Sequence, residues 1–253
     1  METFLREPGR KGKPALGFWC GISHPLVAEA LAAAGPDYVC VDMQHGANTA
    51  SSLVSMLQAV VAGGSAPIVR VPSLDPAAIM LALDSGARGV IVPLIESAEQ
   101  AATAVAACRY PPYGNRSFGP FRASLQAGSS DPRELEKVAC IVMIETRAGI
   151  ENMEAIIATE GVTAAYVGPS DLSLALGLAP GSIDDPAFVD VRDRIVAACA
   201  RHGVVAGMHC ASGEQARAAV AQGFGMATVA GDLALVRQAV AAELGAARGA
   251  SMA

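Results

Sequence analysis

Four polar residues that could carry out metal or acid–base chemistry each end or follow a short apolar run. Glu145 follows "CIVMI" and Asp171 follows "AAYVGPS". Their carboxylates are hard oxygen ligands, which suit Mg²⁺ or Mn²⁺ with other positions left for water or substrate. An ion held there could polarise a carbonyl group and stabilise an enolate. Arg70 could bind a carboxylate or enolate oxygen through its planar guanidinium, and His45 could move a proton near neutral pH.

Further polar residues stand at the ends of the apolar runs. Asp42 lies three residues before His45 and is one candidate partner for its imidazole. Trp19 stands near the end of the first run. Four other polar residues near the ends of the runs are expected to have structural roles, as helix caps, ion-pair partners or packed side chains. They are Glu96, Arg147, His209 and Asp232.

Apolar runs and Ala-rich helical stretches alternate regularly along the chain. This alternation would set the positions of the polar residues named above. The runs are continuous, as is typical of strands buried on both faces of a parallel sheet. Helical stretches begin with a capping residue before proline, as at Asp75 and Asp185, and end at glycines such as Gly35 and Gly203. The eight runs cover residues 15–22, 38–44, 67–71, 89–95, 139–146, 164–170, 204–210 and 226–232.

Eight strand–helix units in 253 residues predict an α/β fold, a single-domain (β/α)8 TIM barrel over residues 1–253. A doubly wound open sheet is the alternative, because a strand count made from sequence is easily wrong. Within the barrel we expect an N-terminal extension at 1–14, a long loop at 110–132 and a C-terminal helix at 232–248. The carboxyl ends of barrel strands share one mouth, which would bring the four polar residues named first together.

Composition and charge exclude several classes of protein. Hydrophobic residues make up 52% of the chain and charged residues 17%, which supports a large buried core. The net charge is −6 and there is no run of Lys or Arg, so we expect no nucleic-acid partner. We find neither a membrane-spanning apolar stretch nor a signal segment. The six cysteines include no C-x-x-C pair, and we expect a cytoplasmic protein with reduced thiols.

Lysine usage narrows the possible chemistry further. The three lysines are Lys11, Lys13 and Lys137, and none lies at the carboxyl end of an apolar run. A Schiff-base aldolase or a pyridoxal phosphate (PLP) enzyme needs such a lysine in its site, so we expect no Schiff base and no PLP. A glycine-rich phosphate loop in the right context is also missing, so we expect no NAD. An enolate formed here would therefore need a metal ion to hold it.

Several motifs together resemble those of a known enzyme family. They are "VDMQHG", "PIVRV", "RYPPYGNRSFG", "MIETRAGIENMEAI" and "VGPSDLSLALG". The chain resembles, from about residue 15 to 245, the metal-dependent (class II) pyruvate aldolases, the 4-hydroxy-2-oxo-acid aldolase branch of the aldolase/citrate lyase family. The resemblance implies reversible aldol cleavage of a 4-hydroxy-2-oxo acid to pyruvate or hydroxypyruvate and an aldehyde, through a metal-stabilised enolate. It also implies a (β/α)8 barrel and a homo-hexamer built from dimers that exchange a helix.

The resemblance also implies roles for individual residues. Glu145 and Asp171 match the ligands of the divalent ion, which we expect to be Mg²⁺ or Mn²⁺, with Co²⁺ or Zn²⁺ as alternatives. His45 matches the catalytic base, and Asp84 matches an acid from a neighbouring subunit that tunes this histidine; we group Asp42 with these catalytic residues. Relatives that cleave dicarboxylic hydroxy-oxo acids often have glutamine at the position of Met143, where it reaches the bound pyruvate, and methionine cannot make the same hydrogen bond. We expect the substrate to contact Trp19, Arg70, Met143, Gly168, Pro169, Ser170 and Asp171.

Two other functions stay open on the sequence alone. The first is an acyl-CoA lyase of the malyl-CoA or citramalyl-CoA type, as in citrate lyase subunits. The second is a barrel without catalytic activity that binds a carboxylate ligand. Cleavage of a CoA thioester would favour the first, and metal binding without turnover of any 2-oxo acid would favour the second.

Overall fold

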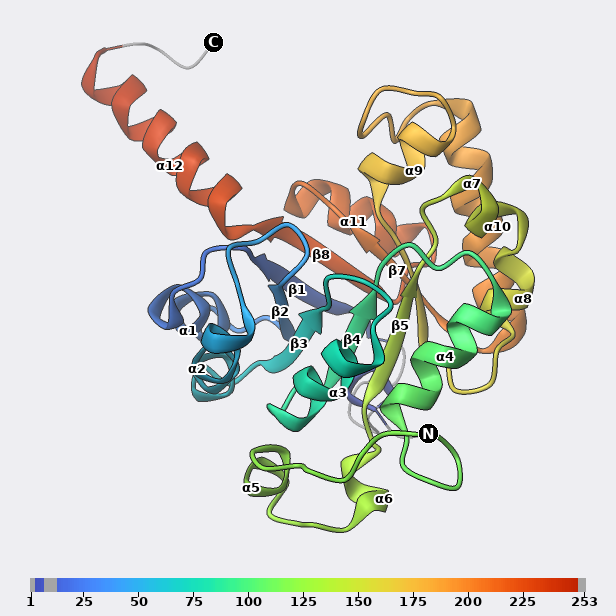
Figure 1. Ribbon diagram of the computed structural model, residues 1–253. Helices are drawn as coiled ribbons and strands as arrows, with labels where there is room; N and C mark the ends of the chain where they lie inside the picture. The colour runs from blue at the N-terminus through green and yellow to red at the C-terminus, as the bar shows by residue number, and fades with distance from the viewer. Residues whose placement is uncertain (1–2, 7–12, 250–253) are drawn as a thin grey trace.

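The computed structural model describes residues 3–6 and 13–249 and shows a closed barrel of eight parallel strands (Figure 1). The barrel closes where β1 pairs with β8, with Ala15 beside Met226. The predicted (β/α)8 barrel is therefore confirmed, and the open sheet is excluded. The strands are β1 (Ala15–Cys20), β2 (Tyr38–Asp42), β3 (Ala66–Arg70), β4 (Gly89–Val92), β5 (Ala139–Met143), β6 (Ala164–Val167), β7 (Val205–His209) and β8 (Met226–Gly231).

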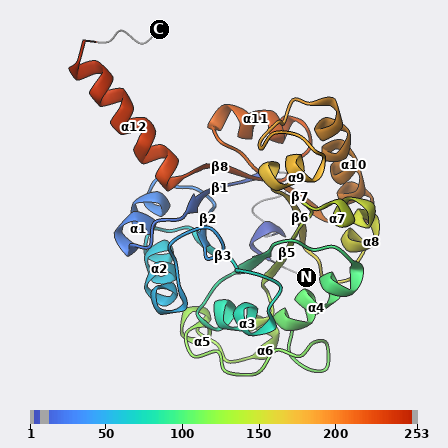
Figure 2. The same ribbon diagram turned by 45° about the horizontal axis from the view of Figure 1, so that its top comes forward.

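Helices surround the barrel, as the view in Figure 2 shows. Asp75 and Asp185 cap two of them by accepting hydrogen bonds from the N–H groups of Ala77 and Ala187. The helices are α1 (Pro25–Ala33), α2 (Ala50–Ala62), α3 (Pro76–Asp84), α4 (Ala98–Cys108), α5 (Ala123–Ala127), α6 (Pro132–Leu135), α7 (Arg147–Glu151), α8 (Met153–Ile157), α9 (Pro169–Ala175), α10 (Pro186–His202), α11 (Gly213–Ala221) and α12 (Asp232–Ala247).

Apolar side chains fill two separate layers, one between strands and helices and one inside the barrel. The inner layer includes Tyr38 and Tyr166, whose hydroxyls both lie within hydrogen-bond distance of Thr228 Oγ1, at 3.0 and 2.6 Å. Phe4, in a short 3₁₀ helix, packs its ring 6.3 Å from that of Tyr38. The described part of the predicted N-terminal extension therefore packs on the inner layer; residues 1–2 and 7–12 lie outside the described residues.

The predicted loop at 110–132 is more ordered than its sequence indicates. It contains α5, and α6 begins at its last residue. Arg116 is fully buried, donates to Asp84 Oδ1 at 2.8 Å and lies 4.7 Å from the ring centre of Tyr110. Because this segment joins α4 to β5, it lies at the end of the barrel where the strands begin (Figure 1). It is therefore remote from the strand carboxyl ends of its own chain.

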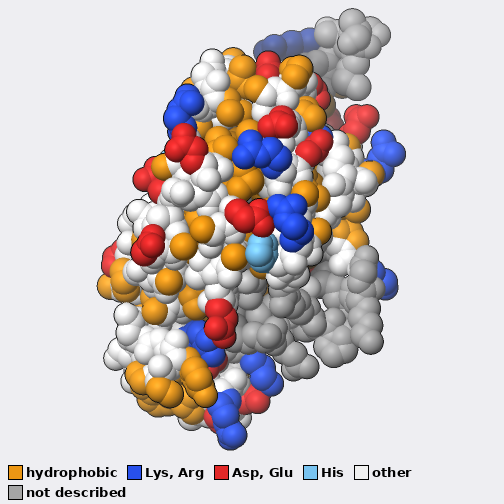
Figure 3. All heavy atoms as spheres, turned by 90° about the vertical axis from the view of Figure 1, so that its right-hand side faces the viewer, with side chains coloured by type: hydrophobic (Ala, Val, Ile, Leu, Met, Phe, Trp, Pro, Cys, Tyr) orange, Lys and Arg blue, Asp and Glu red, His pale blue; other side chains and the backbone are white. Residues whose placement is uncertain are grey.

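Helix α12 extends away from the barrel in both ribbon views (Figures 1 and 2). Four of its large apolar side chains are exposed, and they recur at three- and four-residue spacing: Leu233, Val236, Val240 and Leu244. Among the described helices, none is both long and apolar enough to cross a membrane. On the side of the barrel seen in Figure 3, acidic and basic side chains are mixed with apolar ones.

Candidate active site

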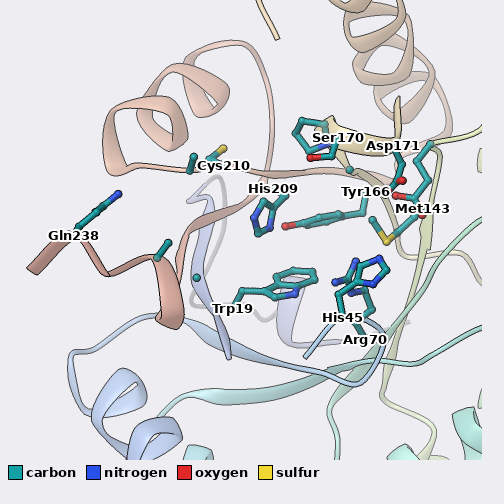
Figure 4. Close-up of a pocket in the computed structure, with 16 residues that line it drawn as sticks. Trp19, His45, Arg70, Met143, Tyr166, Ser170, Asp171, His209, Cys210 and Gln238 are labelled. Carbon is teal, nitrogen blue, oxygen red and sulfur yellow. The ribbon is translucent and has the colours of Figure 1, made fainter. Parts of the chain in front are cut away.

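A cavity of about 390 Å³ opens at the carboxyl ends of the strands (Figure 4). It is lined by His45, Glu145 and all seven residues that the sequence analysis assigns to substrate contact. The structure thus brings together nine of the eleven predicted site residues, whose roles stay predictions. The two that do not line it are Asp42 and Asp84.

Asp42 lies directly behind Arg70. The β2–β3 register places the two residues side by side, and the Arg70 guanidinium donates from Nε and Nη2 to the two carboxylate oxygens, at 2.8 and 2.6 Å. Burial alone would raise the pKa of Asp42, but the hydrogen bonds and charge of Arg70 outweigh it and lower that pKa. Asp42 therefore holds Arg70 rather than the imidazole of His45. Within the described residues, Arg70 Nη1 has no hydrogen-bond partner and remains available to a ligand.

His45 lies in the loop after β2 and its side chain is exposed at the cavity mouth. Its backbone N–H donates to Asp42 Oδ1 at 3.3 Å, which fixes the turn that carries it. Its ring makes no hydrogen bond to any residue that the structure describes. The imidazole can therefore accept a proton from a ligand without first breaking a bond inside this chain.

Glu145 follows β5 and is almost completely buried, with 2% of its surface exposed. Its Oε1 accepts a hydrogen bond from the N–H of Leu94 at 3.1 Å, whereas Oε2 is buried without a partner among the described residues. Burial, together with the nearby charge of Asp171, raises the pKa of Glu145 to about 7. A buried carboxylate oxygen without a donor is a site where a cation would be stabilised.

The ends of β5 and β6 approach closely beside this carboxylate. Gly168 leaves so little space that a β-carbon there would collide with Glu145 Oε2 and lie 2.9 Å from Met143 Cε. Leu94 adopts a left-handed backbone conformation (φ 56°), which is uncommon for leucine. The N–H of Leu94 donates to Glu145. The position of the Glu145 side chain therefore depends both on the left-handed backbone at Leu94 and on the absence of a side chain at Gly168.

The carboxylates of Glu145 and Asp171 fit a divalent ion that takes few ligands from the protein. Glu145 and Asp171 line the same cavity on adjacent strand ends, and no cluster of three or more His, Cys, Asp or Glu suited to a metal occurs among the described residues. Mg²⁺ is commonly held by one or two carboxylates and completes its coordination with water and substrate oxygens. The unpartnered Oε2 of Glu145 and the carboxylate of Asp171 match this chemistry.

An aromatic wall forms another side of the cavity, and of its residues only Trp19 was predicted from the sequence to contact the substrate. The Trp19 ring lies 5.7 Å from that of Tyr166 and 5.0 Å, edge-on, from that of His209; the Arg70 guanidinium lies 5.0 Å from its centre. Alternation within the run "AAYV" could have indicated that Tyr166 points into the barrel. The prediction that His209 is packed at the rim was incomplete, because its side chain faces the cavity (Figure 4).

Asp84 is the second predicted site residue that does not line the cavity. It is the last residue of α3, five residues before β4 begins, and it pairs with Arg116. That position is at the opposite end of the barrel from the cavity. Asp84 therefore cannot act on His45 of its own chain, and its predicted role requires a second copy.

Other polar residues at strand ends have structural roles, as expected. Asp232 is buried and accepts hydrogen bonds from the N–H groups of Gly21 and Ile22, at 3.0 and 2.8 Å. Arg147 donates to the carbonyl oxygen of Ala175 at 3.0 Å. These contacts join α7 to α9, and the start of α12 to the segment after β1.

Comparison with known proteins agrees with this geometry. Residues 15–239 match the model of the family described as HpcH/HpaI aldolase/citrate lyase. The chain belongs to the HpcH/HpaI aldolase/citrate lyase family. It is 39% identical to the hydroxypyruvate/pyruvate aldolase of Rhizorhabdus wittichii, over 93% of this chain and 94% of that protein. It is 36% identical to the 5-keto-4-deoxy-D-glucarate aldolase of Klebsiella pneumoniae, over 88% of each chain.

Solved structures of the HpcH/HpaI family share the fold. A family member from Burkholderia cenocepacia J2315 superposes with a TM-score of 0.86 at 33% identity, over 94% of this chain and 95% of that one. Similarity of this extent, to relatives that are aldolases, makes the protein a carbon–carbon lyase. The resemblance noted in the sequence is thereby confirmed at the level of the family and of the reaction class.

Proposed function

We propose that this family member is a divalent-metal-dependent aldolase that cleaves a 4-hydroxy-2-oxo acid to pyruvate or hydroxypyruvate and an aldehyde. The observation that carries the proposal is the buried Glu145 carboxylate, with its unpartnered Oε2, in one cavity with Asp171, Arg70 and His45. The activity of the Rhizorhabdus wittichii relative on hydroxypyruvate and pyruvate supports this choice of donor.

Glu145 and Asp171 would hold the ion, with Mg²⁺ or Mn²⁺ the first choice and Co²⁺ or Zn²⁺ as alternatives. When bound, the ion supplies a Lewis acid that polarises the 2-oxo group. Arg70 contributes a fixed positive charge at the same cavity, because Asp42 holds Nε and Nη2 and leaves Nη1 free to donate to a ligand. A preorganised donor of this kind stabilises charge that develops on a substrate oxygen.

His45 is the base in this proposal. In cleavage it accepts the proton of the C4 hydroxyl, the C4 oxygen becomes an aldehyde carbonyl, and the C3–C4 bond breaks. The bonding electron pair becomes the enolate of pyruvate, whose oxygen charge Arg70 balances. Return of a proton to C3 gives pyruvate, and the reverse steps give condensation.

The protein is also proposed to work as a homo-oligomer, and the sequence resemblance implies a hexamer. The exposed apolar face of α12 supports association with a second copy, because a row of four large apolar side chains on a projecting helix is unfavourable in water. The exposed His45 ring, which lacks a partner in its own described chain, supports the assignment of Asp84 to a neighbouring subunit's site.

Condensation assays on metal-stripped protein test the proposal. The protein is mixed with pyruvate or hydroxypyruvate and a panel of aldehydes, with EDTA or with Mg²⁺ or Mn²⁺, and products are identified by mass spectrometry. We expect carbon–carbon bond formation only with the ion. Cleavage of malyl-CoA or citramalyl-CoA without any aldol product would instead identify a thioester lyase.

A further inference from the structure

The cavity extends well beyond the residues assigned to the donor. Asp171 and Arg70 lie on one side, whereas Cys210 and Gln238 lie on the other, where residues of β7, β8 and α12 line the cavity (Figure 4). A volume of about 390 Å³ is within the roughly 300–1,000 Å³ of small-molecule sites. A three-carbon oxo acid on the side of Asp171 and Arg70 leaves the other side, the second part of the cavity, for another molecule.

His209, the last residue of β7, is one of the polar residues that line this second part. Its ring stands edge-on to Trp19, with the ring centres 5.0 Å apart and the planes at 87°, so packing fixes its orientation. Within the described residues its ring nitrogens have no hydrogen-bond partner. By contrast, His24 accepts from the N–H of Leu26 and His202 lies 2.7 Å from Glu154. The His209 ring faces the cavity and no side chain of the described residues occupies its nitrogens, so both are available to hydrogen-bond a ligand bound there.

The charge state of His209 limits the kind of ligand. Burial, together with the nearby charge of Arg70, lowers its pKa to about 4. The imidazole is therefore neutral at ordinary pH, with one nitrogen donating and the other accepting. This chemistry suits a hydroxyl group, which both donates and accepts, better than a second carboxylate.

We propose that His209 is a specificity-determining residue that binds a hydroxyl group of the acceptor aldehyde. The proposal rests on the proposed aldolase function and adds the substrate class: a short aldehyde with a hydroxyl next to or near the carbonyl. Ala211 and Ala234, which line the same cavity, have no polar side-chain atom to compete with His209 for this hydroxyl group. An aldehyde without a hydroxyl would leave the imidazole unpaired, which disfavours its binding.

The test compares glycolaldehyde with acetaldehyde, which differ by one hydroxyl, at a fixed pyruvate and metal concentration. The measured quantity is the ratio of their kcat/KM values. His209→Phe keeps an aromatic ring against Trp19 but cannot hydrogen-bond, and we expect it to lower the ratio by about tenfold. His209→Gln restores a donor and an acceptor, so it should lower the ratio less. His202→Phe, the same change on the surface of α10, is the matched control and should keep the wild-type ratio.

A wild-type ratio retained by His209→Phe would overturn the assignment. So would a change confined to the preference between hydroxypyruvate and pyruvate, because His209 would then contact the donor. Metal-dependent deuterium exchange of pyruvate by the wild-type protein involves no aldehyde. It therefore tests the proposed aldolase function separately from the role of His209. If exchange occurs but glycolaldehyde is not preferred, only the role of His209 fails; if no exchange occurs, the proposed function fails as well.

Discussion

At the scale of single residues, Arg70 and His45 have separable tasks. Arg70 stabilises the enolate oxygen, whereas His45 acts on the C4 hydroxyl. Decarboxylation of oxaloacetate passes through the same enolate but has no C4 hydroxyl to deprotonate. We therefore expect Arg70→Lys, which loses the two-point contact with Asp42, to slow both reactions by about 10²–10³. His45→Ala should slow aldol cleavage by about 10²–10⁴ and leave decarboxylation much less affected.

Steady-state assays of both reactions on both variants check this division. Equal losses in both reactions for His45→Ala would remove it from the role of C4 base. Full activity of Arg70→Lys in decarboxylation would separate Arg70 from the enolate.

His209 should also make stability depend on pH. Its pKa is lowered from 6.5 to about 4 in the folded protein, so between these values the unfolded chain binds more protons. The part of the free energy of unfolding that is linked to His209 is therefore highest above pH 6.5. It decreases as the pH falls from 6.5 through 4. Between pH 7 and pH 5 the loss should be about 2 kcal/mol.

Urea unfolding of wild-type and His209→Phe proteins, without metal and at one protein concentration, measures this component. Groups common to both proteins, including Glu145, cancel in the difference. The same pH dependence in both proteins would show that His209 does not titrate with a lowered pKa.

At the scale of elements, the meeting of the β5 and β6 ends shapes the metal site. A β-carbon at Gly168 would collide with Glu145 Oε2 and crowd Met143, so Gly168→Ala must displace that carboxylate oxygen. We expect metal affinity, measured by calorimetric titration, to fall about 10- to 100-fold. Gly245→Ala, where a β-carbon meets nothing within 4 Å, is the matched control. Unchanged affinity in Gly168→Ala would contradict the assignment of Glu145 as a ligand in this geometry.

The sequence predicted the elements well because the strand signal is local. Each of the eight predicted runs contains or nearly coincides with a strand, and capping residues such as Asp75 and Asp185 mark the helix starts. Strand ends then located Glu145 and Arg70. The segment at 110–132 was harder, because its order depends on Arg116, a buried charge whose partner lies 32 residues earlier at Asp84.

Contacts between distant segments account for the parts of the site that the sequence did not indicate. The Leu94 N–H meets Glu145 across 51 residues, and the left-handed backbone at Leu94 has no sequence signature. The pairing of Asp42 with Arg70 depends on the register of two strands. Tyr166 and His209 join the cavity only when the barrel closes.

At the scale of the whole molecule, α12 is the element that the single chain leaves unexplained. Its exposed row of Leu233, Val236, Val240 and Leu244 lies on one face at about 100° per residue. We expect the double variant Val236→Glu, Val240→Glu to lower the molar mass in solution, measured by light scattering after size-exclusion chromatography. Ala242→Glu adds a charge on the opposite face as the control. A wild-type protein that is monomeric, or a double variant of unchanged mass, would contradict the proposed assembly.

We propose that the cavity forms an enolate of a 2-oxo acid with the help of a divalent ion. The most direct test is to mix metal-stripped protein with pyruvate in D₂O and follow the methyl signal by NMR, with and without Mg²⁺ or Mn²⁺. No aldehyde has to be guessed. Metal-dependent loss of the signal is the predicted result. No exchange with either ion, for pyruvate and for hydroxypyruvate, would contradict the aldolase assignment and favour a thioester lyase or a binding protein.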